Sequence, residues 1–258
     1  MSLSNVSDVH TLVLSAQFSA HLMNPRHVLG IIGDMEYVLP FATLNSVKDL
    51  QSFATRAKAL DTTGIRFVVS GNVLAVSVSV MHPAGLGDGV PIVIGLRTFA
   101  LDFSDDDERF EVDSVFEMDA VTDRTHRMIS SGTTRFALPP SAISVNWTAM
   151  DAPRSGWAAA AVVDDAEIRS VARNGISKVG EGLPANPGAP LLAQVRSAVW
   201  GEQLGDPAQV EFPAGATLGA HSLGFLLPRG ETTVSKSGGW VRLSSAGGHV
   251  LARPAVAL

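Results

Sequence analysis

Apolar residues recur at helical spacing in the first part of the chain. Residues 8–23 carry an apolar stripe at spacings of three and four, which predicts a helix capped by Asp8. Pro25 ends that helix because proline lacks a backbone donor, and a short second helix is expected over residues 25–33. A third helix is expected over residues 46–60, where one face collects five apolar side chains: Val47, Leu50, Ala54, Ala57 and Leu60.

The pattern then changes to the period of two that is typical of strands. Four runs rich in apolar or β-branched residues follow: 65–70, 73–81, 91–103 and 110–121. The second run alternates strictly, with Val76, Val78 and Val80 against Ser77 and Ser79. Strict alternation of this kind predicts an antiparallel sheet that buries one of its two faces.

The second half of the chain repeats the order of helices followed by strands. Residues 130–156 are rich in loop signals, including two adjacent prolines, and mark the expected boundary between two subdomains. Helices are expected after it over residues 164–180, 190–200 and 214–227. Three short strands separated by Gly-Gly turns then predict a terminal meander: 232–236, 240–245 and 249–253.

These elements together predict an α+β fold with helices packed on antiparallel sheets. We expect an N-terminal α+β subdomain over residues 1–129, a loop-rich connection over 130–156, and a helical segment with a terminal β-meander over 157–258. The similar order of elements raises the hypothesis of an internal duplication, although no repeat is visible residue by residue.

Composition narrows the class of protein. Hydrophobic residues make up 46 % of the 258 residues and charged residues 17 %, against about 25 % charged in an average protein, which is typical of a packed globular chain. The formal net charge of −6 argues against a nucleic-acid partner, since phosphate backbones are bound mainly by Lys and Arg. The absence of cysteine excludes a disulfide framework, a thiolate metal site and a cysteine nucleophile.

The apolar runs and the first residues of the chain bear on its cellular location and on membrane contact. No apolar run is long enough to span a membrane, and the first residues lack the basic region of a secretory signal. We therefore expect a cytoplasmic protein without a membrane partner.

Three local patterns look like binding or metal motifs and have plainer interpretations. Residues 85–89 contain three glycines but precede strand sequence rather than a helix, so they predict a strand connection and no phosphate loop. The segment 102–119 holds nine carboxylates, but it lacks the glycine and the ligand spacing of a calcium loop. We therefore interpret it as a turn and a strand with a solvated, charged face; the alternative is adventitious binding of a divalent ion. His10 and His21 lie three helical turns apart, too far to share a metal. We expect no cofactor and no metal.

One surface hypothesis arises in the terminal meander. If residues 240–245 pair with 249–253 across an even-length turn, then Trp240, Arg242, His249 and Arg253 project from one face of the sheet. A tryptophan with two arginines is typical of an interface hot spot or an anion-binding platform, while the plainer interpretation is a solvated face with an arginine stacked on Trp240. In one form of the interface hypothesis the protein self-associates, and this face of one copy binds the acidic strand, residues 110–121, of another copy.

Five segments of the C-terminal half are shared with known sequences: 155–157, 196–200, 223–226, 237–243 and 248–251. In these segments the chain resembles a family of uncharacterised proteins from high-GC Gram-positive bacteria, the actinobacteria. The resemblance covers roughly the last hundred residues well and the acidic middle poorly. The family implies no established activity and no site residue. Glycines, tryptophans and aliphatic residues dominate the shared segments, and turns and core packing explain them as well as function does.

The sequence contains no recognisable motif of catalytic residues, such as a nucleophile paired with a base. We therefore expect a non-catalytic protein that binds a protein partner or assembles with itself. The alternative is a small-molecule-binding protein or enzyme with a site between the two subdomains, where the loops at 83–91 and 130–156 would act as lids. Polar groups that would converge in such a site are His82, Asp88 and His126.

Overall fold

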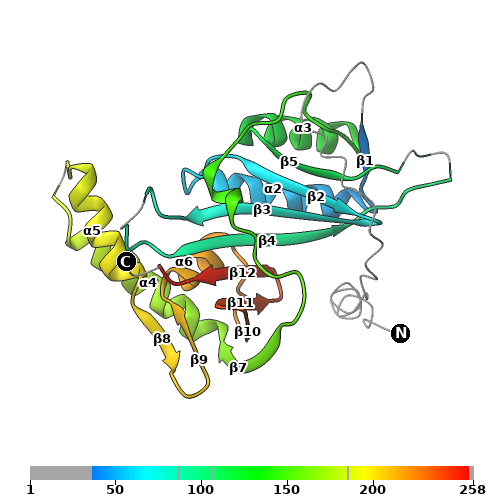
Figure 1. Ribbon diagram of the computed structural model, residues 1–258. Helices are drawn as coiled ribbons and strands as arrows, with labels where there is room; N and C mark the ends of the chain where they lie inside the picture. The colour runs from blue at the N-terminus through cyan, green and yellow to red at the C-terminus, as the bar shows by residue number, and fades with distance from the viewer. Residues whose placement is uncertain (1–36, 86–87, 106, 108, 185, 256–258) are drawn as a thin grey trace.

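The computed structural model describes residues 37–85, 88–105, 107, 109–184 and 186–255. Within them the chain forms an α+β fold built on one continuous antiparallel sheet of eight strands (Figure 1). The two helices expected over residues 8–23 and 25–33 lie outside the described residues.

The eight strands follow the order β5-β2-β3-β4-β12-β11-β10-β7 across the sheet. The N-terminal half supplies β2 (Ile65–Ser70), β3 (Val73–Met81), β4 (Ile92–Ala100) and β5 (Val112–Phe116). The C-terminal half supplies β7 (Ala158–Asp164), β10 (Glu231–Ser237), β11 (Trp240–Ser245) and β12 (Gly248–Arg253). The halves meet where β4 pairs with β12, so the main sheet is shared between them.

Five α-helices, one 3-10 helix and two small sheets complete the described part of the chain. The α-helices are α2 (Leu44–Lys58), α3 (Met118–Ser131), α4 (Asp165–Glu181), α5 (Ala189–Trp200) and α6 (Gly215–Ser222). The 3-10 helix η1 spans Asn146–Ala149. The small sheets pair β1 (Val38–Pro40) with β6 (Arg135–Ala137), and β8 (Gln203–Asp206) with β9 (Val210–Pro213).

The main core lies between the helices and one face of the sheet, and both halves contribute to it. Thr43 caps α2 by accepting a hydrogen bond from the Ser46 backbone N–H at 3.1 Å. The buried stripe of α2 then brings Phe53 against Phe225 of the C-terminal half, with ring centroids 5.8 Å apart. Gly95 on β4 allows Leu223 to pack directly on the sheet, because a side chain at Gly95 would overlap it. The two halves therefore share one core.

A segment that we call the strap, residues 138–157, crosses the other face of the sheet (Figure 1). It carries Trp147, which packs in a second hydrophobic cluster with Ile92, Ile94 and Trp240. The backbone N–H of Ile143 donates to Val115 at 2.8 Å and fixes the strap to β5. The strap closes over part of the sheet face, which would otherwise expose large apolar side chains to water.

Several expectations from the sequence are confirmed and others are wrong. The strands expected at 65–70, 73–81 and 91–103, the three strands of the terminal meander, and the helices near 164–180 and 190–200 are confirmed. The strand expected over 110–121 ends at Phe116, and α3 begins at Met118 and continues into the expected loop region. The helix expected over 214–227 ends at Ser222, where Gly224 adopts a φ of 74°.

Residues 130–156 contain the end of α3, β6 and η1, and apart from an isolated bridge at Ile143 the rest of this region forms no helix or strand. The strap packs on the sheet through Trp147. The division into subdomains 1–129 and 157–258 stays a prediction.

Candidate functional site: the free edge of the sheet

Strand β7 forms one edge of the eight-stranded sheet. Among the described residues it pairs with β10 alone, so one row of its backbone N–H and C=O groups lacks a neighbouring strand there. Its side chains are four alanines, two valines and a terminal Asp164. Val162 is 61 % exposed, the highest exposed fraction of any large apolar residue in the described ranges. β7 therefore combines an open backbone edge with an apolar, accessible side chain.

Edges of natural sheets usually carry features that prevent strand addition, such as proline, lysine, inward charges or a covering segment. β7 contains no proline and no lysine, and its one charge stands at its last residue. A β-bulge at Ala160, opposite Val234 and Ser235, is the one feature of this kind on β7. Sequence reasoning missed this strand, because four consecutive alanines favour a helix and give no alternating pattern.

The opposite edge, β5, is guarded. The guanidinium of Arg66 donates to both carboxylate oxygens of Asp113, Nε to Oδ1 at 2.7 Å and Nη2 to Oδ2 at 2.8 Å. The strap also pairs with β5 at Val115 through Ile143. A charged pair and a bridging segment are both devices that discourage another strand, which leaves β7 as the open edge.

The four meander residues singled out in the sequence share one face of the sheet, as the register of β11 and β12 places them. Trp240 and His249 are only 3 % and 7 % exposed, and Trp240 packs against Trp147 of the strap. The Nδ1 atom of His249 lies 3.0 Å from the Ser244 hydroxyl. Arg253 is half-buried at the end of β12. The face is thus mainly an interior surface, and binding through these four residues stays a prediction.

Arg242 differs from the other three residues in being a partly buried cation that contacts an aromatic ring of the strap. Its guanidinium carbon lies 4.8 Å from the ring centroid of Trp157 on the strap, so the arginine stacks on Trp157 and not on Trp240 as the sequence had suggested. Burial lowers the pKa of Arg242 from its ordinary value, and its Nε atom is the one buried side-chain nitrogen or oxygen without a hydrogen-bond partner in the described part of the chain. Arg242 therefore holds the end of the strap to β11.

Of the three polar residues proposed for an intersubdomain site, two lie in one connection and the third lies elsewhere. His82 and Asp88 both lie in the connection between β3 and β4, where His82 Nδ1 is 2.9 Å from the buried Ser79 hydroxyl. Asp88 accepts backbone hydrogen bonds from Ala84 and Val90, so its carboxylate shapes the connection. His126 lies on α3, where it is exposed. His82 thus lies within hydrogen-bonding distance of Ser79, with Asp88 in the same connection, whereas His126 lies on a separate helix.

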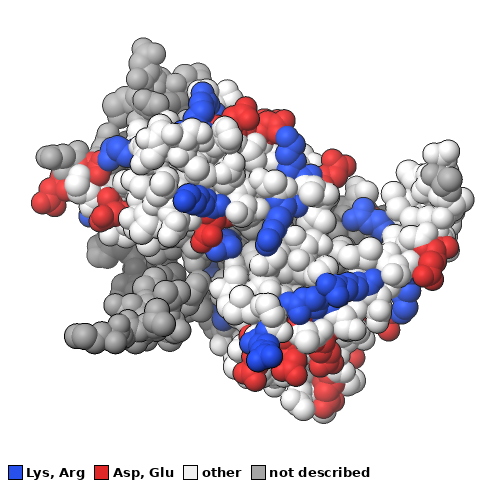
Figure 2. All heavy atoms as spheres, turned by 180° about the vertical axis from the view of Figure 1, so that it is seen from behind, with Lys and Arg blue, Asp and Glu red and all other residues white. Residues whose placement is uncertain are grey.

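Cationic side chains gather on the helix-covered face. Figure 2 shows Lys and Arg forming a broken band across the middle of this face, with Asp and Glu mainly towards its margins. Arg56 of α2 donates to the Leu223 carbonyl at 3.1 Å, and Arg169 of α4 donates to the Leu227 carbonyl at 3.0 Å. Both arginines bind the chain that follows α6; Arg56 thereby joins the two halves, and Arg169 joins two segments of the C-terminal half.

Two histidines should make the stability of the protein depend on pH. Burial lowers the pKa of His82 and, next, the cation Arg196 lowers it further, while Asp88 opposes them. Burial also lowers the pKa of His221, followed by the nearby cations Arg173 and Arg169. Because both folded-state pKa values lie below the unfolded value of about 6.5, the unfolded chain binds more protons in mildly acidic solution, and stability is lost as the pH falls below that value.

We expect the thermal midpoint to fall between about pH 7 and pH 5, and to fall less in a His82→Gln/His221→Gln variant. Comparison with the wild type separates these two histidines from the carboxylates that also titrate on acidification. The control is His126→Gln, an exposed histidine on α3. If the double variant keeps the full pH dependence, these histidines do not cause it.

The described residues contain no group of three His, Asp or Glu side chains that could hold a metal ion. In the same ranges, no helix is both long and apolar enough to cross a membrane. The cytoplasmic location and the actinobacterial source stay predictions.

Residues 152–257 match a family model described as "Domain of unknown function (DUF8185)". This match covers the part of the chain for which the sequence resembled an uncharacterised family. No protein with a curated description matches the chain.

Solved structures with a similar arrangement include bacterial sliding clamps. The DNA polymerase sliding clamp of Pseudomonas aeruginosa is 14 % identical, with a TM-score of 0.44 over 87 % of this chain and 65 % of the clamp. The DNA polymerase III beta subunit of Thermotoga maritima is 14 % identical, with a TM-score of 0.44 over 86 % of this chain and 65 % of that one. The chain thus spans 65 % of the length of these two proteins. Similarity at this level carries no argument about function.

Proposed function

We propose that this chain is a non-catalytic binding protein that assembles with a second copy of itself through β7. The observation that carries the proposal is the open, apolar, proline-free edge formed by β7, with Val162 exposed on it. An extended strand at such an edge can bind another strand through backbone hydrogen bonds, which require no particular side-chain chemistry.

The side chains of β7 favour its own copy as the partner. In an antiparallel pair related by a two-fold axis near Ala161, Asp164 of one copy lies opposite Ala158 of the other. The two carboxylates then stand at opposite ends of the interface, about 20 Å apart at the usual rise per residue. Alanines fill the centre, so neither bulk nor like charge opposes the approach.

The acidic edge is a poorer partner for β7. Asp113, Glu111 and Glu117 lie on or next to β5, and Asp164 would add a further negative charge to that pairing. The strap also blocks β5 at Val115. The symmetric β7 pairing extends the sheet of one copy into that of the other and avoids both obstacles.

Val162→Lys should abolish assembly, because a lysine on an edge strand opposes strand addition. We expect the wild type, followed by light scattering at increasing protein concentration, to approach twice its monomer mass of 27.0 kDa. The variant should remain near the monomer mass throughout. The control is Ile176→Lys, which introduces the same charge at an apolar residue of α4 that is 45 % exposed; this variant should assemble as the wild type does.

Any of three results would contradict the proposal: a wild type that remains monomeric at submillimolar concentration, a Val162→Lys variant that assembles as the wild type does, or a dimer that dissociates at high salt. The last result would favour pairing of the arginine-bearing meander face with the acidic strand, because salt screens exposed charges and leaves backbone strand pairing largely intact.

A further inference from the structure

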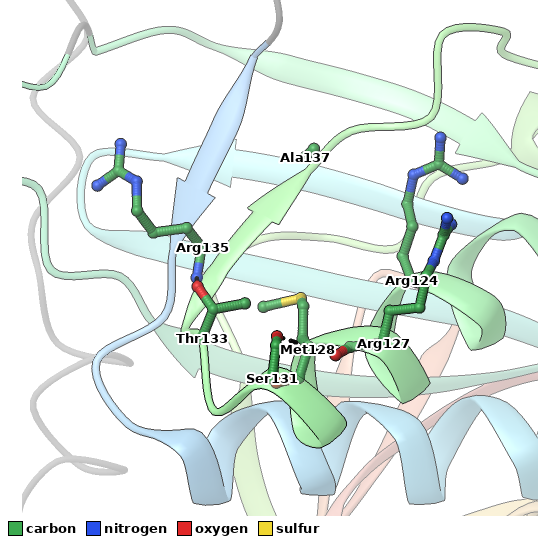
Figure 3. A pocket seen from close by; sticks show the side chains of 7 residues that line it. All are labelled: Arg124, Arg127, Met128, Ser131, Thr133, Arg135 and Ala137. Atoms are coloured by element: carbon green, nitrogen blue, oxygen red, sulfur yellow. Dashed lines mark hydrogen bonds between the residues drawn. The ribbon is translucent and has the colours of Figure 1, made fainter.

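A cavity of about 270 Å³ opens between the second half of α3 and the strand β6 (Figure 3). One wall consists of α3 side chains at helical spacing, and the other of alternate residues from Thr133 to Ala137. The buried side chain of Met128 lies between the two walls and forms an apolar floor. The cavity lies within the N-terminal half and is remote from β7.

Cationic groups dominate the lining of this cavity. Arg124 and Arg127 extend together on one side, and Arg135 stands on the other side of Met128 (Figure 3). Ser131 and Thr133 add hydroxyl groups, and no Asp or Glu is part of the lining. A site with three guanidinium groups is unusual in a chain whose net charge is −6.

The three arginines differ in how far they are already neutralised. Arg135 Nη2 lies 2.7 Å from Asp107 Oδ1, and Arg135, together with hydrogen bonds from Ser104, holds the pKa of the Asp107 carboxyl well below its usual range. Arg124 and Arg127 hydrogen-bond only to backbone carbonyls of their own helix, at 3.1 and 3.3 Å. Neither forms an ion pair within the described ranges, so two positive charges at the cavity lack a protein counterion there.

We infer that this cavity binds a small phosphate monoester, with its phosphate group held by Arg124 and Arg127. The planar guanidinium group matches phosphate oxygens in a bidentate manner, and residues three apart on a helix are neighbours that can reach one anion. The hydroxyls of Ser131 and Thr133 lie on the same cavity and offer further donors. The floor at Met128 accommodates the carbon part of the ligand.

The size of the cavity supports a compact ligand. Pockets for drug-sized molecules usually occupy about 300–1,000 Å³, so this cavity suits a molecule of the size of glycerol 3-phosphate. The inference is independent of the proposed assembly through β7, because no residue of that edge lines the cavity.

Calorimetric titration of the full chain with glycerol 3-phosphate tests the inference. We expect one saturable site, and an Arg124→Gln/Arg127→Gln variant should bind at least about tenfold more weakly, because the phosphate then loses both of its charge-assisted guanidinium partners. The matched control is Arg154→Gln/Arg229→Gln, which removes two exposed arginines elsewhere and should leave the affinity unchanged. Glycerol alone should not bind.

A second variant keeps the test informative if the double variant folds poorly. Asp107→Asn removes the counterion of Arg135, so the affinity for glycerol 3-phosphate should rise, a result that damage to the fold does not produce. The inference is overturned if the wild type shows no saturable binding at millimolar ligand, or if the control variant weakens binding equally. It is also overturned if sulfate, inorganic phosphate and glycerol 3-phosphate bind alike in the millimolar range, which would indicate an adventitious ion only.

Discussion

Trp147→Ala should lower the free energy of unfolding by about 3–5 kcal/mol, the usual range for removing a buried aromatic side chain. The indole of Trp147 is buried between the strap and the sheet, where it packs with Ile92, Ile94 and Trp240. Its Nε1–H donates to the Thr63 carbonyl at 3.0 Å, so the substitution also removes the partner of that carbonyl. The strap should separate from the sheet before the rest of the molecule unfolds.

Chemical denaturation followed by circular dichroism measures the loss of stability, and trypsin cleavage at Arg154 reports release of the strap. Met150→Ala is the matched control, since Met150 lies on the same segment and is exposed. We expect this control to change stability by no more than about 0.5 kcal/mol. Equal losses for the two variants would show that Trp147 does not anchor the strap.

Asp165→Ala is expected to lower the free energy of unfolding by about 3 kcal/mol. Asp165 is fully buried at the start of α4, where Oδ2 accepts the Leu227 N–H at 2.7 Å and Oδ1 accepts the Thr232 hydroxyl at 2.6 Å. The carboxylate also lies at the positive end of the helix dipole. Its removal leaves the Leu227 N–H without its acceptor, and it releases the connection between α6 and β10.

The neighbouring residue provides the control for this prediction. Asp164 is exposed and makes no side-chain capping hydrogen bond to α4, so Asp164→Ala should change stability by about 0.5 kcal/mol or less. Both variants remove one carboxylate from adjacent positions, and global charge effects therefore cancel in the comparison. A loss below about 1 kcal/mol for Asp165→Ala would contradict the role assigned to these hydrogen bonds.

The elements that the sequence predicted well are those whose local pattern and burial agree. In β3 the valines at positions 76 and 78 are fully buried, and the serine at position 77 between them is more exposed, as the alternation required. The meander was predictable because two Gly-Gly turns bound its apolar runs.

Helix α3 was missed because its buried stripe is only partly apolar. The stripe includes Thr125, which is buried because its hydroxyl donates to the Val121 carbonyl one turn earlier at 3.1 Å. Acidic residues before the helix continued the alternation of β5, so the strand pattern appeared to extend through Met118. The cavity on α3 was missed with the helix, since its arginines share a face only in helical geometry.

The environment of the meander residues depends on contacts that no local pattern records. Trp240 is buried because Trp147, more than ninety positions earlier, lies against it. A strand of alternating polar and apolar residues gives no sign that a distant segment covers its polar face. The sequence therefore predicted which side chains share a face and not whether water reaches them.

The pairing of β4 with β12 also has a consequence for how the protein is made. The two strands are separated by about 150 positions along the chain, so the sheet has many contacts between distant residues, and such a topology folds slowly. During synthesis one side of β4 stays unpaired until β12 has been made. Chains that stop before β12 should accordingly be prone to aggregation, because this side of β4 then lacks its partner strand.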